Sequence, residues 1–217
     1  MRAPRTLFAV AMLLGSYTAA TAANIGNIYN TGVNNSGVAF ASPNVVDPHY
    51  SIILPANNTA VTVDDTTYPF PPWLPNNAGS RWIGPAADSF GPAGPWIYRT
   101  TFTVPANAIL STVSVTGDWA TDDPGTDIRI NGASTGQTSP SYLALTPFSI
   151  NSGFVAGTNT LDFYLTNAGG PTGLRVDHIS GTYQVPEPQV VFLATVVISV
   201  SALVRRRRSQ KYFGQCA

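Results

Sequence analysis

The sequence predicts an all-β fold, a single jelly-roll β-sandwich, and three observations carry this prediction. From residue 96 onward, apolar side chains recur at every second position, as in strands that bury one face. Glycine, proline, asparagine and aspartate separate these runs. No comparable window between residues 24 and 184 has helical spacing. Many short strands joined by tight turns favour one sandwich of about eight strands.

The strands are expected to follow one another closely. The predicted inward positions are Trp96, Tyr98, Thr100, Phe102 and Val104, then Val113 and Val115, then Ile128 and Ile130, then Leu161, Phe163 and Leu165, and finally Leu174 and Val176. Between them, Asp162 and Tyr164 are predicted to face outward. The predicted turns are 105–107, 123–125, 131–132, 157–159 and 167–171. At Asn131-Gly132 we expect a type I′ hairpin turn, because both residues tolerate positive φ.

The first 23 residues have the pattern of a secretory leader. Arg2 and Arg5 precede an apolar run at 7–14, and small residues at 20–22 suit a signal peptidase. A core helix of a cytosolic protein is the alternative, but Gly15-Ser16 and the small residues end the apolar run too early for one. We therefore expect an exported chain that begins near Ala23 or Asn24.

Charge is distributed unevenly along the chain. Seven of the eleven basic residues lie in the two terminal segments. Residues 24–184 contain four arginines and ten aspartates, which leaves a net charge of −6. Such a region would repel phosphate, so nucleic acid is excluded as a partner. Cys216, the one cysteine, cannot form an internal disulfide or a cysteine-based zinc site.

The C-terminal segment, 185–217, has three parts. Pro186, Glu187 and Pro188 precede an uncharged apolar run that predicts a membrane helix over about 189–204, and the cluster Arg205, Arg206, Arg207 and Arg208 follows at once. Such a helix spans about 24 Å at about 1.5 Å per residue, and long arginines can reach the rest of a hydrocarbon core of about 30 Å. The arginines predict a cytoplasmic C-terminus. A buried strand is excluded, because the run does not alternate.

Residues 185–217 resemble the PEP-CTERM sorting signal of Gram-negative bacteria that make extracellular polysaccharide. The resemblance implies recognition by a membrane-embedded exosortase, which would cut near residues 186–188. It also implies a protein anchored in the inner membrane before processing and found at the cell surface or outside the cell afterwards.

Residues 24–184 resemble the ectodomain common in PEP-CTERM proteins, which is similar to the galactose-binding-like jelly roll. The segments that carry this second resemblance are 47–50, 80–85, 98–102, 117–123, 127–132, 153–161 and 172–176. The fold implied hosts sugar-binding, accessory and adhesion domains alike.

Three functions follow as expectations. The first is a non-catalytic surface or matrix protein, processed at the envelope and associated with extracellular polysaccharide. The second is a lectin-like module with a defined sugar ligand, and the third is an extracellular hydrolase. The sequence does not favour an enzyme. His49 and His178 stand outside catalytic motifs, and residues 24–184 contain no lysine for Schiff-base chemistry. His178 is predicted to be partly buried on the face of Leu174 and Val176.

Four aspartates form the densest polar cluster. Asp118, Asp122, Asp123 and Asp127 lie within ten residues, beside Pro124-Gly125. Calcium prefers oxygen ligands of this kind, and the family resemblance adds a precedent for a structural calcium ion. The alternative is that these aspartates bond their own turns. A calcium site here is a hypothesis, and no cofactor is certain.

Aromatic residues supply the other candidate site. A sugar can stack its apolar face on exposed rings, and the candidates for such a platform are Trp73, Trp82, Trp96 and Trp119 with Tyr68, Phe70 and Tyr98. Trp82, Trp96 and Trp119 border predicted strands, which favours the core, whereas Trp73 lies in a Pro-Phe-Pro-Pro-Trp segment and is predicted to be exposed. Trp73 and Trp82 are the candidate carbohydrate-binding residues.

Overall fold

Two antiparallel sheets form the body of the protein in the computed structural model, which describes residues 20–56 and 58–186. The six-stranded sheet contains, in this order, β10 (Thr146–Ile150), β7 (Ile109–Asp122), β13 (Gly173–Pro186), β4 (Ile83–Gly84) and β3 (Val61–Thr62), and β1 (Ala20–Asn24) pairs with β13. The five-stranded sheet contains β2 (Tyr50–Leu54), β6 (Gly94–Val104), β11 (Gly157–Asn167), β8 (Gly125–Ile130) and β9 (Ala133–Ser134). A small sheet pairs β12 (Gly170–Pro171) with β5 (Phe90–Gly91).

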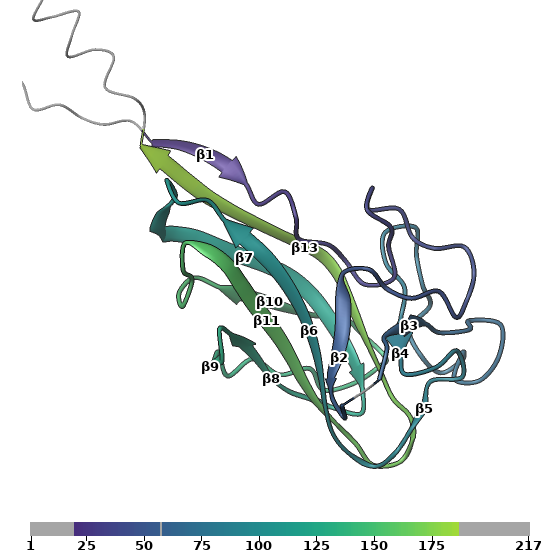
Figure 1. The fold of residues 1–217 in the computed structure, drawn as a ribbon. Helices are drawn as coiled ribbons and strands as arrows, with labels where there is room; N and C mark the ends of the chain where they lie inside the picture. The colour runs from purple at the N-terminus through teal and green to yellow at the C-terminus, as the bar shows by residue number, and fades with distance from the viewer. Residues whose placement is uncertain (1–19, 57, 187–217) are drawn as a thin grey trace, which may run out of the picture. The chain divides into compact units, whose positions relative to one another are not determined.

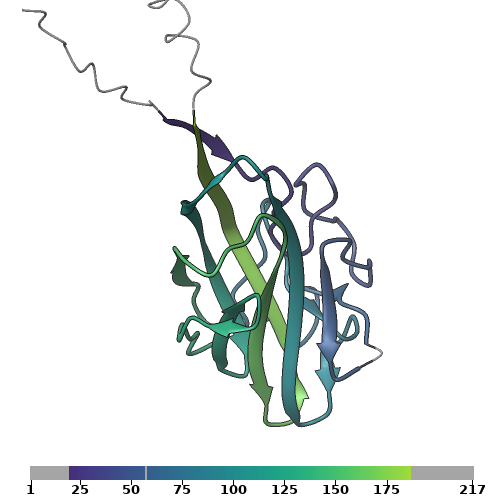
Figure 2. The ribbon, with the colours of Figure 1, turned by 60° about the vertical axis from the view of Figure 1, so that its left-hand side comes forward.

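The compact unit spans Thr21–Val185. Within it, β1 and the end of β13 lie at one end, whereas β5 lies at the opposite end (Figure 1). The turned view shows the long strands of the two sheets running one behind the other (Figure 2). The predicted all-β sandwich is therefore confirmed.

The strands are more numerous than the sequence predicts. The described residues form thirteen strands, and five of these, β3, β4, β5, β9 and β12, have only two residues. Alternation reveals none of the five strands that precede β6, because β1 and β2 have five residues and β3, β4 and β5 have only two. Tertiary pairing rather than local pattern places them.

The core lies between the two sheets, where the predicted inward positions meet. All fourteen of those positions, from Trp96 to Val176, are buried. The ring of Phe163 in β11 lies 5.6 Å from Trp119 in β7 and 5.9 Å from Phe148 in β10, measured between ring centroids. Because these pairs join strands of opposite sheets, they hold the sandwich closed. Burying each such side chain stabilises the fold by about 1.5–3 kcal/mol.

The Asn131-Gly132 turn is confirmed. Both residues have positive φ, 50° and 83°, and they join β8 to β9. The predicted turn at 157–159 is wrong, because Gly157 already pairs with Val104 as the first residue of β11. Glycine suits this strand start, where φ is +91°.

His178 does not lie on the buried face of β13. The pairing of β13 with β7 shifts register between Asp177 and Ser180, and this bulge turns the His178 side chain outward. Its Nδ1 atom lies 3.0 Å from an Asp118 carboxylate oxygen. The prediction of a partly buried histidine is wrong because a strict period of two cannot foresee a bulge.

A buried ion pair fastens the long loop before β4 to the six-stranded sheet. Arg175 donates to Asp177 of the same strand at 3.3 Å and to the Ser80 hydroxyl at 2.8 Å. It also donates to the Pro75 carbonyl. Asp177 accepts a further bond from the Asn77 side chain at 2.7 Å. The loop is thus positioned by polar contacts, with the pair itself almost fully buried.

Most of the terminal predictions lie outside the described residues. This holds for residues 1–19 of the predicted leader, for Glu187 and Pro188, for the expected membrane helix at about 189–204, and for Arg205, Arg206, Arg207 and Arg208. Of these segments the structure describes Ala20–Ala23, within β1, and Pro186, at the end of β13. Across residues 20–56 and 58–186, no helix has the length and apolar character needed to cross a membrane.

Candidate functional site

A groove lined by polar and apolar side chains lies beside β2. Its volume is about 400 Å³. Side chains from β2, from β6 and from the two loops next to β2 line it: Val46, Asp47, Pro48, His49, Tyr50, Ser51, Asn58, Thr59, Ala60, Arg99 and Thr101. Concave sites with a few convergent polar groups are where proteins usually hold small ligands.

Arg99 is held in the groove by a buried carboxylate. Its Nε and Nη2 atoms donate to the two oxygens of Asp162 at 2.6 and 2.7 Å. The Asp162 side chain is only 2% exposed, whereas that of Arg99 is 37% exposed. The hydrogen bond from Asp162 raises the pKa of Arg99, so the guanidinium stays charged. The fork geometry fixes the arginine, which lines the groove, and its Nη1 atom makes no hydrogen bond with the described residues.

Asp162 belongs to a row of polar residues across the outer face of the five-stranded sheet. Register places Ser51 opposite Arg99, Arg99 opposite Asp162, and Asp162 opposite Arg129. The prediction that Asp162 lies on the outward face is therefore confirmed, although flanking side chains cover it. Arg129 lies 4.3 Å above the ring of Tyr164 and bonds Asp127 at 2.9 Å. Alternating charge across the strands stabilises this face.

Asp47 shapes the loop that forms one wall of the groove. Its carboxylate accepts three backbone N–H groups, from Gly32 at 2.6 Å, His49 at 2.7 Å and Tyr50 at 3.0 Å. Burial raises the pKa of Asp47, and these N–H groups oppose that rise. The carboxylate therefore acts mainly as an anchor for the turn into β2.

His49 presents a fixed ring beside this anchor. It stacks on Tyr29 with 3.7 Å between ring centroids, and its Nε2 atom lies 3.3 Å from the Asn34 carbonyl oxygen. With Ser51, Asn58 and Arg99, the groove offers ordered hydrogen-bonding groups next to the apolar Val46 and Pro48. This arrangement suits a ligand with many hydroxyl groups and some apolar surface, because both kinds of contact are already in place.

The four candidate calcium ligands do not form one ligand set. Asp118 pairs with His178, and Asp127 pairs with Arg129. Asp122 accepts the Trp73 indole N–H at 2.7 Å, and Asp123 accepts the Ala168 backbone N–H at 2.7 Å. In residues 20–56 and 58–186, no group of three or more His, Cys, Asp or Glu side chains is arranged to hold a metal ion.

The candidate carbohydrate-binding tryptophans are buried. Trp73 is 2% exposed and Trp82 is fully buried, so the prediction that Trp73 is exposed is wrong. Trp73 and Trp82 pack together at 4.3 Å between centroids, inside a small cluster with Val63 and Ala120. The Trp73 indole N–H donates to Asp122, which is distant in sequence, so Trp73 can be buried without an unpaired donor. The exposed aromatic rings of this region are those of Tyr68 and Phe90 instead.

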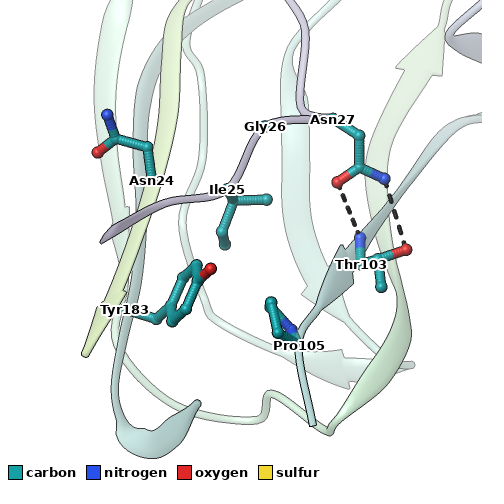
Figure 3. A pocket seen from close by; sticks show the side chains of 7 residues that line it. All are labelled: Asn24, Ile25, Gly26, Asn27, Thr103, Pro105 and Tyr183. Atoms are coloured by element: carbon teal, nitrogen blue, oxygen red, sulfur yellow. Dashed lines mark hydrogen bonds between the residues drawn. The ribbon is translucent and has the colours of Figure 1, made fainter. Parts of the chain in front are cut away.

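A second hollow, of about 270 Å³, lies at the end of the sandwich where β1 and β13 meet. Figure 3 shows its walls: the segment from Asn24 to Asn27, Tyr183 of β13, Thr103 near the end of β6, and Pro105 just after it. The Asn27 side chain closes one wall by bonding Thr103, whose N–H donates to Oδ1 at 3.1 Å. Its lining is more apolar and has fewer hydrogen-bonding side chains than the groove beside β2.

Comparison with known proteins finds only remote structural similarity. No protein-family model matches the chain, and no curated protein matches it either. A family 35 carbohydrate-binding module from Clostridium thermocellum is similar at 13% identity, covering 65% of this chain and 98% of the module, with a TM-score of 0.35. A cyclase from Fischerella sp. TAU is similar at 10% identity, covering 77% of this chain and 100% of the cyclase, with a TM-score of 0.42. These TM-scores carry no conclusion about ligand or activity.

Sequence reasoning missed the main groove residues. Arg99 stands on the outward side of an alternating strand, and it is one of four arginines in residues 24–184. These two facts together were the sequence signal that could have indicated Arg99 as a functional residue. Asp47 and His49 come before the region of clear alternation, so nothing local indicates that they lie beside Arg99. Only the pairing of β2 with β6 brings them together.

Proposed function

We propose that this chain is an exported, non-catalytic surface or matrix protein whose sandwich binds polysaccharide through the groove beside β2. The observation that carries the proposal is the Arg99 guanidinium, held by buried Asp162 and directed to a groove rich in hydrogen-bonding groups. Sugar hydroxyls need such prepositioned donors and acceptors. The proposed fold type is a jelly roll of the galactose-binding-like kind.

The proposed route to the surface rests on the terminal sequence patterns. The leader at 1–23 would start export, and the segment 185–217 would anchor the protein in the inner membrane of a Gram-negative bacterium until an exosortase processes it. Mass spectrometry of the intact protein from its host tests both ends at once. Masses that correspond to removal of residues up to about 23 and to cleavage near 186–188 support this route, whereas a full-length chain in the cytosol contradicts it.

Titration of the protein with purified extracellular polysaccharide of the host tests the binding function. Thr101 is an exposed residue of the groove wall, so a Thr101→Trp substitution should fill the groove and weaken binding about tenfold or more. The matched control is Thr182→Trp on exposed β13 surface, which should bind as the unmodified protein does. Equal affinity of both variants would contradict the groove as the ligand site. Saturable binding of one oligosaccharide would make the protein a lectin with a defined sugar.

A further inference from the structure

Two aromatic rings at the opposite end of the sandwich from β1 are exposed and in contact. Tyr68 is 60% exposed and Phe90 is 53% exposed. Their ring centroids lie 6.4 Å apart, and the rings are inclined at 48° to each other. Single exposed apolar side chains are common, but two large aromatic rings in contact form a patch that needs an explanation.

The backbone under both rings is well anchored. The Phe70 N–H bonds the Thr67 carbonyl at 2.8 Å, and the Trp73 N–H bonds the Pro69 carbonyl at 2.9 Å, which fixes the turn that carries Tyr68. Phe90 lies in β5, opposite Pro171 of β12. Rings on anchored backbone lose little conformational entropy when a ligand binds.

Buried aromatic residues support this turn from below. Phe70 packs edge-on against Trp73 at 5.6 Å, and Trp73 in turn packs against Trp82. The indole N–H of Trp73 is already used by Asp122. The tryptophans are thus the base of the patch and Tyr68 and Phe90 are its surface.

The charge around the rings selects among ligands. Residues 64–68 and 87–90, which carry the two rings, contain Asp64, Asp65 and Asp88 and no basic residue. Hydrogen bonds from Thr66 hold the pKa of Asp64 below its ordinary value, so it stays ionised at neutral pH. Asp65 is paired with the nearly buried Arg81 at 3.0 Å. The remaining charge is negative and disfavours anionic lipids and acidic polymers.

Asp88 adds an acceptor next to the rings. Its Oδ1 atom accepts the Phe90 N–H at 3.1 Å, and the side chain is exposed, so its other lone pairs face solvent. An exposed carboxylate beside an aromatic ring can bind a pair of hydroxyl groups while the ring contacts the apolar face of the same molecule.

We propose that Tyr68 and Phe90, with Asp88, form a second glycan contact that takes uncharged pyranose residues. This inference rests on the proposed polysaccharide binding and adds the chemical class of sugar, namely neutral residues with an apolar C–H face. The groove and the ring pair would then contact separate parts of one polymer, which raises its apparent affinity.

Calorimetric titration of the full chain with a neutral glucan or mannan tests the inference. Because the full chain includes the expected membrane helix, the titration is carried out in detergent. The detergent should have no sugar headgroup, so that it does not compete with the glycan for the rings. Tyr68→Ala and Phe90→Ala should each weaken binding about two- to tenfold. Tyr68→Phe and Phe90→Trp should restore it, because they keep the ring. The matched control is Leu110→Ala at the start of β7, which removes an exposed apolar side chain near the end of β13, away from the two rings.

The outcomes separate this inference from the groove. Unchanged binding by Tyr68→Ala and Phe90→Ala, together with weaker binding by Thr101→Trp, overturns the ring pair and leaves the groove standing. The reverse result supports the ring pair and overturns the groove. Absence of binding to any neutral or acidic polysaccharide overturns both. Stronger binding of the Thr101→Trp variant, whose groove is filled, to an acidic polymer than to a neutral one also overturns the ring-pair assignment, because the carboxylates beside the rings predict the opposite.

Discussion

At the scale of single residues, burial and partner decide what each side chain does. Trp73 is predicted to be exposed because proline-rich segments usually are, yet Asp122 supplies an acceptor and the ring is buried. Asp162 lies on the predicted face but is covered, because Arg99 pairs with it. Alternation can assign the face of a residue, but it cannot reveal a partner that lies 63 positions away.

Removing Arg99 should destabilise the fold, because Asp162 then loses its ion-pair partner. Arg99→Ala leaves the Asp162 carboxylate buried without its counter-ion, and we expect a loss of about 2–3 kcal/mol in the free energy of unfolding. Arg129→Ala should cost less than about 1 kcal/mol, because the backbone N–H of Gly136 still bonds Asp127. Urea denaturation measures both variants. Equal losses would contradict the role given to Asp162.

Asp122 should make stability depend on pH. Burial raises its pKa from 3.8 to about 6. Between these values the folded state holds a proton that the unfolded state has released, so stability falls as pH rises through this window. Asp122→Asn keeps an acceptor for Trp73 and carries no charge. Its melting temperature should therefore exceed that of the unmodified protein at pH 7.5 and match it near pH 4.

The control for this pH effect is Asp118→Asn, which alters an exposed pair with His178 and should change little at either pH. Thermal unfolding followed by circular dichroism gives all the midpoints. A lower midpoint for Asp122→Asn at pH 7.5 would show that the charged carboxylate stabilises the fold after all.

At the scale of strands and loops, the long strands after residue 94 were predictable, whereas β10, the bulge in β13 and the strands before residue 94 were not. The long strands β6, β7, β11 and β13 alternate for many residues, and the Asn131-Gly132 turn has a strong local preference. The short β3 and β4 have no such signal. They are ordered by contacts such as those of Arg175, which no local pattern contains.

Loss of Arg175 should detach the loop before β4. Arg175→Ala leaves Asp177 buried and frees the Ser80 hydroxyl and Pro75 carbonyl, so we expect at least about 3 kcal/mol of destabilisation. Arg175→Lys should recover little of the lost stability, because an ammonium group lacks the planar geometry with which the guanidinium bonds its three partners. Hydrogen exchange should rise first at Asn77–Arg81. Uniform exchange across the whole sandwich would contradict a local anchor.

At the scale of the whole molecule, the sandwich contains its own core. The main cluster of buried apolar residues begins at Ile25 and ends at Ile179. The sequence predicted this single module correctly as a fold class, because its alternating strands have no competing helical pattern. The location of the polar groove was not predictable, since it depends on which strands become neighbours.

A chain of residues 24–186 should therefore fold without the terminal segments. It loses the first four residues of β1, whose side chains contact little of the core, and it keeps Ile25, whose N–H bonds the Gly181 carbonyl at 2.8 Å. We expect cooperative unfolding with a midpoint within about 4 °C of that of the full chain, the shift that about 1 kcal/mol produces. Non-cooperative melting of the shortened chain would contradict this expectation.

The pairing of β1 with β13 also determines how the protein can be handled. Since these strands begin and end the compact unit side by side, a tag or linker joined near Thr21 and one joined near Val185 leave from the same end (Figure 1). Immobilisation of the compact unit on a sensor chip through a linker at either of these two positions therefore leaves the far end of the unit facing the flowing solution.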